Sequence, residues 1–149
     1  MSKSNALESD YLNHLFCNAD IALVGDATGL VKSTASGSLY ISLHTADVGE
    51  TGNQTTSEAT YTDYTRIGVE RNSGKWTVSG TAPTQVQNAN AITFPTCTGS
   101  SSLISHFAIG TAFSGAGKVL YYGTLSPNIN ITTGITPSIA ALGLIVTED

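Results

Sequence analysis

The feature that most constrains the fold is a series of short stretches, from Leu39 to the end of the chain, in which apolar and polar residues alternate. Glycine, proline, asparagine and serine separate these stretches, and such alternation is typical of strands that bury one face. Many short strands of this kind favour an all-β sandwich. We therefore predict a mainly β fold, with a single jelly-roll-like β-sandwich in residues 39–149.

The predicted strands are separated by turns and by one long polar loop. Hairpin turns are expected at residues 71–75 and 114–117, because asparagine and glycine accept positive φ angles. Residues 45–60 form the longest polar stretch, and a loop of that length in a compact domain is either functional or mobile. The expected strands are residues 39–44, 64–71, 75–79, 85–94, 103–109, 118–125, 128–132 and 138–147.

Residues 1–38 are expected to form an N-terminal α-helix and a linker arm. Within residues 5–17 the apolar side chains recur at helical spacing and form one stripe. Asn5 and Glu8 are expected to form a capping box at the start of this helix. Burial of each apolar side chain contributes about 1.5 to 3 kcal/mol, so the stripe is expected to pack on its own domain or on a neighbouring subunit. The stripe consists of Leu7, Tyr11, Leu12, Leu15 and Phe16.

Charge and hydropathy exclude two classes of partner. The net charge is −5, and the six lysines and arginines are spread along the chain, so we expect no nucleic acid to bind. The most apolar runs, residues 21–24 and 139–146, are much shorter than the roughly 20 residues that span a bilayer, so we expect no membrane insertion. Cys17 and Cys97 are expected to be buried free thiols, with a disulfide between them as the alternative.

Ionisable residues are few and scattered, and the serine and histidine residues lack a spacing that would predict catalysis. Ser42 and His44 share a strand face, whereas Ser105 and His106 are adjacent and are expected to point to opposite faces. The chain has no Gly-x-Ser-x-Gly turn for a nucleophile. His14 and the two strand histidines also lack the spacing of known zinc motifs. We therefore expect no enzyme activity, no cofactor and no metal, with His44 satisfied by hydrogen bonds.

Several segments together resemble a known protein family, and they cover most of the chain. They are residues 39–47, 50–52, 58–61 with Tyr64 and Arg66, 76–78, 92–95, 106–107 with 109–110, and 146–149. The family consists of small virion structural proteins of tailed bacteriophages, often described as tail-fibre proteins and including head decoration proteins. The resemblance implies a virion component without catalysis, and it leaves the location on the particle open.

We expect a capsid decoration (cement) protein that binds the outside of the major capsid lattice and stabilises it. A short chain without an internal repeat, with an N-terminal helix and a long loop, favours this function. The expected partners are the major capsid protein and other copies of this chain, so that weak contacts are repeated over the lattice. The candidate assembly contacts are the helix stripe and three acidic loop residues: Asp47, Glu50 and Glu58.

The alternative is a tail-fibre or tail-tip component that binds a host receptor or glycan. Aromatic side chains suit sugar rings, although core and interface positions are more common for them. The candidates for a carbohydrate groove are Tyr61, Tyr64, Trp76, Tyr121 and Tyr122.

Overall fold

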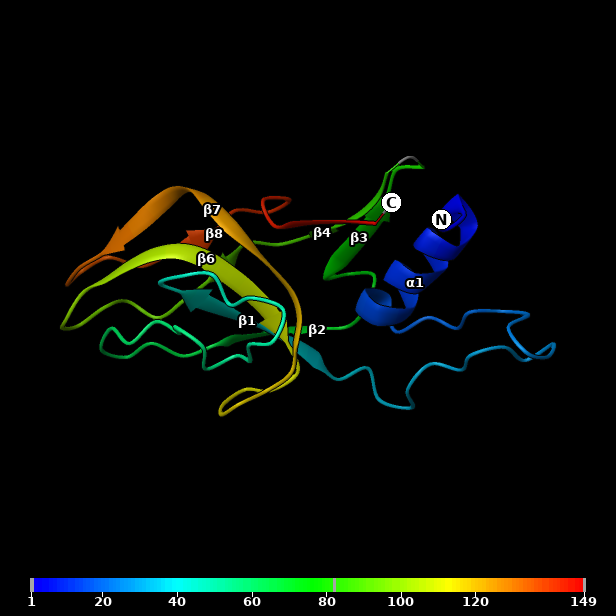
Figure 1. Ribbon diagram of the computed structural model, residues 1–149, viewed down its shortest axis with the longest axis horizontal. Coiled ribbons are helices and arrows are strands. Elements are labelled where there is room, and N and C mark those ends of the chain that lie inside the picture. The colour runs from blue at the N-terminus through cyan, green and yellow to red at the C-terminus, as the bar shows by residue number, and fades with distance from the viewer. Residues whose placement is uncertain (1, 82, 149) are drawn as a thin grey trace. The chain divides into compact units, whose positions relative to one another are not determined.

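The structure is a computed structural model that describes residues 2–81 and 83–148. Within these residues the chain forms one N-terminal helix and nine strands (Figure 1). The strands belong to three antiparallel sheets, which confirms the mainly β fold and the N-terminal helix. The more specific jelly-roll sandwich stays a prediction.

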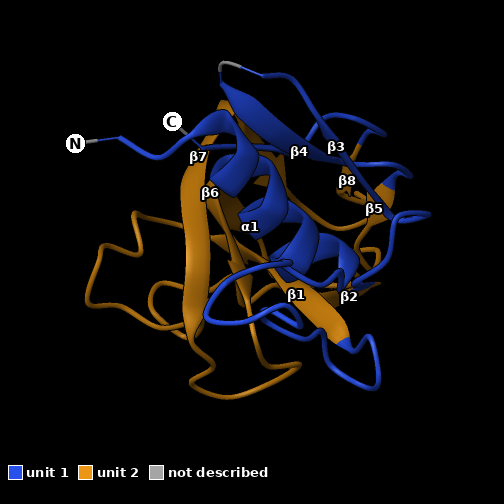
Figure 2. Cartoon of the chain, turned by 90° about the vertical axis from the view of Figure 1, so that its right-hand side faces the viewer, with its two compact units in different colours: residues 1–37, 70–91, 140–149 blue, residues 38–69, 92–139 orange. Residues whose placement is uncertain are grey.

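The chain divides into two compact units (Figure 2). Unit 1 comprises the described residues of 1–37, 70–91 and 140–149. Unit 2 comprises residues 38–69 and 92–139. Unit 1 is thus built from three segments that are distant in the sequence, and it includes the N-terminal residues expected as an arm.

Unit 1 contains the helix α1 (Asn5–Cys17) and a sheet with the strand order β3-β4-β9. These strands are β3 (Trp76–Ser79), β4 (Thr84–Asn88) and β9 (Ile145–Glu148). The helix packs on β3 and β4. Leu12 and Phe16 of α1 are fully buried, and the Phe16 ring meets the edge of the buried Trp76 ring at a centroid distance of 4.8 Å. Two residues of the predicted stripe, Leu12 and Phe16, are therefore part of the core of unit 1.

The start of α1 differs from the predicted capping box. Ser4 is the N-cap residue, and its hydroxyl accepts a hydrogen bond from the backbone N–H of Leu7 at 3.3 Å. Asn5 is already helical, and Glu8 is buried and accepts a hydrogen bond from the Thr84 hydroxyl at 3.0 Å. Serine is as good a cap as asparagine, so the first helical residue could not be assigned from residue preference alone.

Unit 2 contains a larger sheet with the strand order β2-β1-β6-β7. Its strands are β1 (Ser38–His44), β2 (Ile67–Glu70), β6 (Ser102–Gly110) and β7 (Val119–Ile131). In the central pair, β1 and β6 run antiparallel and Ile41 lies opposite Ile109. A second, two-stranded sheet pairs β5 (Ile92–Thr93) with β8 (Ser138–Ile139).

Four predicted strands are divided or joined differently in the structure. The expected strand 85–94 is divided into β4 and β5, because the Asn88 carboxamide donates to the carbonyls of Asn90 and Ala140 and ends the ladder. The expected strand 138–147 is divided into β8 and β9, and Leu142 between them has a positive φ of 62°. The expected strands 118–125 and 128–132 are instead one continuous strand, β7.

Candidate functional site

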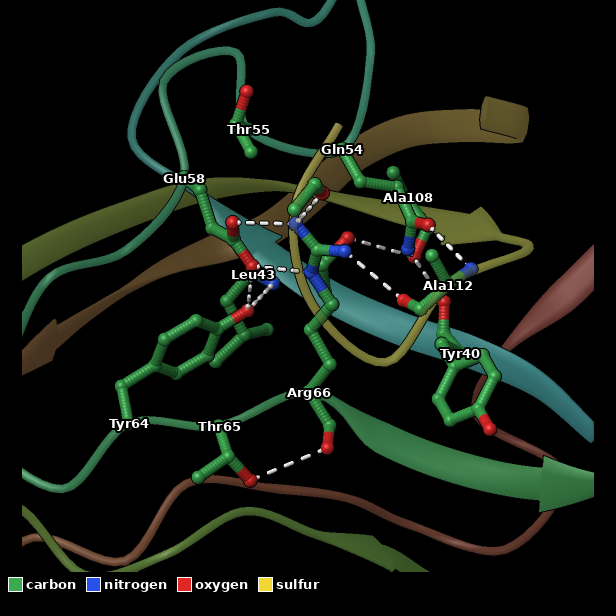
Figure 3. Close-up of polar contacts among 12 residues, drawn as sticks. Tyr40, Leu43, Gln54, Thr55, Glu58, Tyr64, Thr65, Arg66, Ala108 and Ala112 are labelled. Atoms are coloured by element: carbon green, nitrogen blue, oxygen red, sulfur yellow. Dashed lines mark hydrogen bonds and ion pairs between the residues drawn. The ribbon is translucent and has the colours of Figure 1, made fainter. Parts of the chain in front are cut away.

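The second half of the long loop 45–60 is fixed to unit 2 by a buried glutamine. The Gln54 side chain is fully buried, donates to the Tyr40 carbonyl at 3.2 Å and accepts from the backbone N–H of Ala112 at 2.9 Å (Figure 3). A Cβ atom at Gly110 or Gly117 would collide with its carboxamide, so both positions require glycine. The glutamine therefore fills the space that these two glycines leave.

Next to Gln54 lies a buried ion pair between Arg66 and Glu58. The guanidinium donates from Nε and Nη2 to the two carboxylate oxygens, each at 2.7 Å (Figure 3). The Tyr64 hydroxyl donates to Glu58 Oε1 at 3.1 Å and accepts from the backbone N–H of Leu43 at 3.0 Å. Burial raises the pKa of Tyr64, and the hydrogen bond to Glu58 raises the pKa of Arg66. Arg66 is thus charged and Tyr64 protonated at neutral pH.

Arg66 also fixes the turn that follows β6. Its guanidinium donates to the Ala112 carbonyl at 2.9 Å and to the Gly115 carbonyl at 2.8 Å. These bonds place Phe113, which is 57% exposed, beside an open pocket of about 300 Å³. The pocket is lined by Glu58, Ala59, Tyr64, Thr65, Arg66, Phe113, Ser114 and Gly115.

A second polar pair, Ser42 and His44, is fully buried in unit 2. His44 Nδ1 is 2.8 Å from the Thr56 carbonyl, which can only accept, so Nδ1 carries the proton. Nε2 therefore accepts from the Ser42 hydroxyl, with 2.8 Å between the two atoms. Burial lowers the pKa of His44. The prediction of a satisfied histidine is confirmed, and the pair joins β1 to the long loop.

The prediction that Ser105 and His106 point away from each other is wrong. Ser105 Oγ lies 2.8 Å from His106 Nδ1, and it donates to the Thr45 carbonyl at 2.9 Å. The ladder between β6 and β7 is regular up to Ile104 and resumes at His106 in a shifted register. This irregularity breaks the simple alternation of side chains on which the prediction depended.

The family model described as podophage GP4 fiber I protein gp80 matches residues 2–147. The chain belongs to this family. It is therefore a structural protein of the bacteriophage virion, as the resemblance implied. No curated protein matches the chain.

In this phage protein the predicted helix contacts fall into two groups. Leu12 and Phe16 are fully buried in unit 1, so they are not available to a partner in this conformation. Leu7 and Tyr11 are 43% and 42% exposed, and Leu15 is half-buried. One edge of the stripe packs in the core of unit 1, and the other edge is exposed to solvent.

The three predicted acidic contacts also differ from one another. Asp47 and Glu50 are exposed in the first part of the loop, where the Asp47 carboxylate accepts from the backbone N–H of Gly49 at 3.0 Å. Glu58 is instead held by Arg66, and its side chain is 17% exposed. The first part of the loop therefore exposes two acidic side chains, and the second part is fixed by Gln54 and Glu58.

The loop in residues 18–37 was expected only as a linker, yet it is an ordered apolar loop. Ile21 and Leu30 pair through two backbone hydrogen bonds of 2.9 and 2.8 Å, and Asn18 and Ser33 are joined by two more bonds of 3.0 Å. Leu23 at its tip has a positive φ of 64°. The apolar run in residues 21–24 was the signal for this feature. The exposed side chains are Leu23 (79%), Val31 (62%), Leu30 (48%) and Val24 (45%).

The aromatic residues proposed for a carbohydrate groove do not form one exposed surface. Trp76 is fully buried in unit 1, and Tyr61 in unit 2 is 2% exposed. Burial raises the pKa of Tyr61 to about 12, and its hydroxyl donates to the Pro95 carbonyl at 3.1 Å. Tyr64 does line the pocket, but the exposed ring there belongs to Phe113, which the sequence analysis missed. A phenylalanine in a glycine-rich turn was its only signal.

The described residues offer little for metal or thiol chemistry. Across residues 2–81 and 83–148, no three histidine, cysteine, aspartate or glutamate side chains are grouped so that they could hold a metal ion. Cys17 and Cys97 are both free, as predicted, but only Cys97 is fully buried. Cys17 is half-buried, and burial raises its pKa. None of the helices in these ranges has the length and apolarity needed to cross a membrane.

Proposed function

We propose that the protein is a non-enzymatic component of a virion fibre, in which it contacts other copies of itself and a neighbouring virion protein. The observation that carries this proposal is the match of residues 2–147 to a family described as fiber proteins. A structural role requires a rigid fold with surfaces for contact and needs no reactive group.

The apolar loop of unit 1 supports such an assembly role. Four aliphatic side chains stay exposed in a loop that its own hydrogen bonds hold in one conformation. Leu23 also has a left-handed backbone conformation, which is unfavourable by roughly 1 to 2 kcal/mol for a residue with a side chain. Exposed apolar groups of this kind are typical of protein–protein contacts. We propose that they are covered in the particle.

The polar residues of unit 2 favour a structural role over catalysis. Ser42 and His44 are fully buried, so a substrate would not reach them without opening of the sheet. The charges of Glu58 and Arg66 offset each other, and Arg66 also bonds to two backbone carbonyls. Groups held in this way stabilise loops.

Capsid decoration is the second candidate function. Its specific support is the acidic first part of the long loop, where Asp47 and Glu50 are exposed. The second part of the loop is fixed by Gln54. A rigid acidic loop suits a basic region of the major capsid protein, the partner expected for this function. In that case the contact would be repeated over the whole lattice.

The location and copy number in purified virions test both functions. Gold-labelled antibody would show the site, and quantitative mass spectrometry would give the number of copies per particle. A small number of copies at fibres supports the proposal. A large number of copies spread over the head supports decoration instead, and absence from the particle overturns both.

A further inference from the structure

We propose that the pocket beside Arg66 binds a neutral saccharide, through the Phe113 ring and the Glu58 carboxylate. This inference rests on the proposed fibre function only for its biological setting. The pocket itself lies within unit 2, and its lining residues come from the end of the long loop, the segment before β2 and the turn after β6.

The size and opening of the pocket suit a single sugar ring. Its volume is about 300 Å³, at the lower end of the roughly 300 to 1,000 Å³ of small-molecule sites. Phe113 lies at the edge of the pocket and is 57% exposed. The negative face of an aromatic ring attracts the partially positive C–H groups on one face of a pyranose, so an exposed phenylalanine is a suitable platform.

The platform is held in place before any ligand binds. Arg66 bonds to the carbonyls of Ala112 and Gly115 on both sides of Phe113, and the Phe113 ring meets the edge of the Tyr40 ring at a centroid distance of 6.0 Å. A fixed side chain loses little conformational entropy when a ligand binds. The turn is therefore preorganised.

The polar lining can accept hydrogen bonds from sugar hydroxyls. Glu58 Oε1 already accepts from Arg66 and Tyr64, whereas Oε2 accepts only from Arg66 among the described residues, so one lone pair is available. Ser114 adds a hydroxyl that can donate or accept. A carboxylate acceptor beside an aromatic platform gives the ring a defined orientation.

The charges favour a neutral saccharide over an acidic one. The Arg66 guanidinium is directed at Glu58 and at two carbonyls, so its charge is already compensated. The chain has a net charge of −5, which repels uronic, sialic or phosphorylated sugars. The pocket therefore discriminates by charge as well as by shape.

A saccharide array with the isolated full-length protein tests this inference. The array carries neutral and acidic monosaccharides and fragments of bacterial surface polysaccharides, so it separates a free sugar from a surface polymer. We expect the protein to bind neutral saccharides on the array, and the saccharide that binds most strongly is then titrated by calorimetry. Binding to no saccharide, or to acidic saccharides alone, would overturn the proposal.

Four variants locate the binding. Phe113→Ala should weaken the binding by about tenfold or more, and Ser114→Ala should weaken it less. Phe113→Tyr keeps an aromatic ring, so its affinity should be close to that of wild type. Leu103→Ala is the matched control, because Leu103 has the same 57% exposure and also lies in unit 2. Unchanged affinity in Phe113→Ala would also overturn the proposal.

The same variants separate this inference from the fibre function. We expect virions that carry Phe113→Ala to contain the normal number of copies at the normal site. Failure of the array experiment would leave that location unaffected. A wrong location in wild-type virions would contradict the fibre function without changing the affinity of the isolated protein.

Discussion

The two units of the chain use polar and apolar residues in opposite ways. Most of the large apolar side chains that stay exposed among the described residues belong to unit 1: Leu7, Tyr11, Leu23, Val24, Leu30, Val31, Leu142 and Ile145. Unit 1 also buries the polar residues Glu8, Thr84 and Asn88, but in unit 2 the buried side chains of His44, Gln54 and Arg66 bond to the loops and fix them. Unit 1 is thus suited to contact with apolar partners, and unit 2 to the presentation of rigid loops.

The difference also concerns how each unit is held together. In unit 1 an amphipathic helix covers a small sheet, and the contact between Phe16 and Trp76 is at its centre. In unit 2 the loops are tied down by charge-assisted hydrogen bonds such as those between Arg66 and Glu58. Hydrophobic packing is non-directional, whereas buried polar networks define one arrangement of the groups that they join.

The largest expected effect is loss of the helix packing in unit 1. Phe16→Ala removes a fully buried ring and should lower the free energy of unfolding by about 3 to 5 kcal/mol, measured by urea denaturation. Leu7→Ala on the same helix is the control, because Leu7 is 43% exposed and should change the free energy by about 0.5 kcal/mol or less. Equal effects of the two variants would show that α1 is not part of the core.

The ion pair of unit 2 gives the next largest effect. Arg66→Met leaves the Glu58 carboxylate without its charged partner and two turn carbonyls without their donor, so the free energy of unfolding should fall by about 3 kcal/mol. Hydrogen exchange should speed up in residues 112–115, which the guanidinium holds. The double variant Glu58→Met with Arg66→Met removes the unpaired charge and should regain part of the stability. If it is no more stable than Arg66→Met, the buried charge is not the cause.

The difference between the units explains which parts of the structure could be predicted from the sequence. Helical spacing in residues 5–17 and alternation in residues 39–44 are local patterns, and both elements were predicted almost to the residue. The end of β4 depends on bonds from Asn88 to Ala140 and Leu144, which are distant in the sequence. No local pattern contains such a bond, so strands 85–94 and 138–147 were predicted too long.

The candidate site was less predictable than the fold for the same reason. Glu58 was named from its place in an acidic loop, but its partner Arg66 could be identified only after the chain had folded. Phe113 is placed by bonds to the carbonyls on either side of it, which depend on backbone position rather than on residue type. Conversely, Leu12 and Phe16 were correctly placed on one helix stripe, whose buried edge faces the chain's own sheet.

A pH titration provides a smaller test of the buried polar network of unit 2. Burial lowers the pKa of His44 below its ordinary value, so below about pH 6.5 the unfolded chain binds a proton that the folded chain does not. Stability is therefore complete above that pH and falls as the solution is acidified, by at most about 1.4 kcal/mol per pH unit. Nearby Glu58 opposes the shift, whereas Arg66 and His106 add to it.

The comparison of wild type with His44→Gln isolates this contribution. Glutamine can still donate to the Thr56 carbonyl, but it does not titrate, so the urea midpoint of the variant should depend less on pH between 7 and 5 than that of wild type. The same slope in both proteins would contradict a buried neutral histidine.

The smallest expected effect on stability is at Leu23, where the largest effect on assembly is expected. Leu23→Asn places a residue that tolerates positive φ at a position with φ 64° and 79% exposure, so the free energy of unfolding should stay the same or rise by about 1 kcal/mol. If the loop is covered in the particle, the same change should lower the number of copies per virion, measured by mass spectrometry. Leu103→Asn in unit 2 should leave that number unchanged, since Leu103 is also an exposed leucine (57%) but lies outside the loop. A normal copy number for Leu23→Asn would show that the apolar loop does not hold the protein in the virion. A folded and more stable variant that fails to assemble would assign the contact to unit 1, because loss of stability could not then explain the defect.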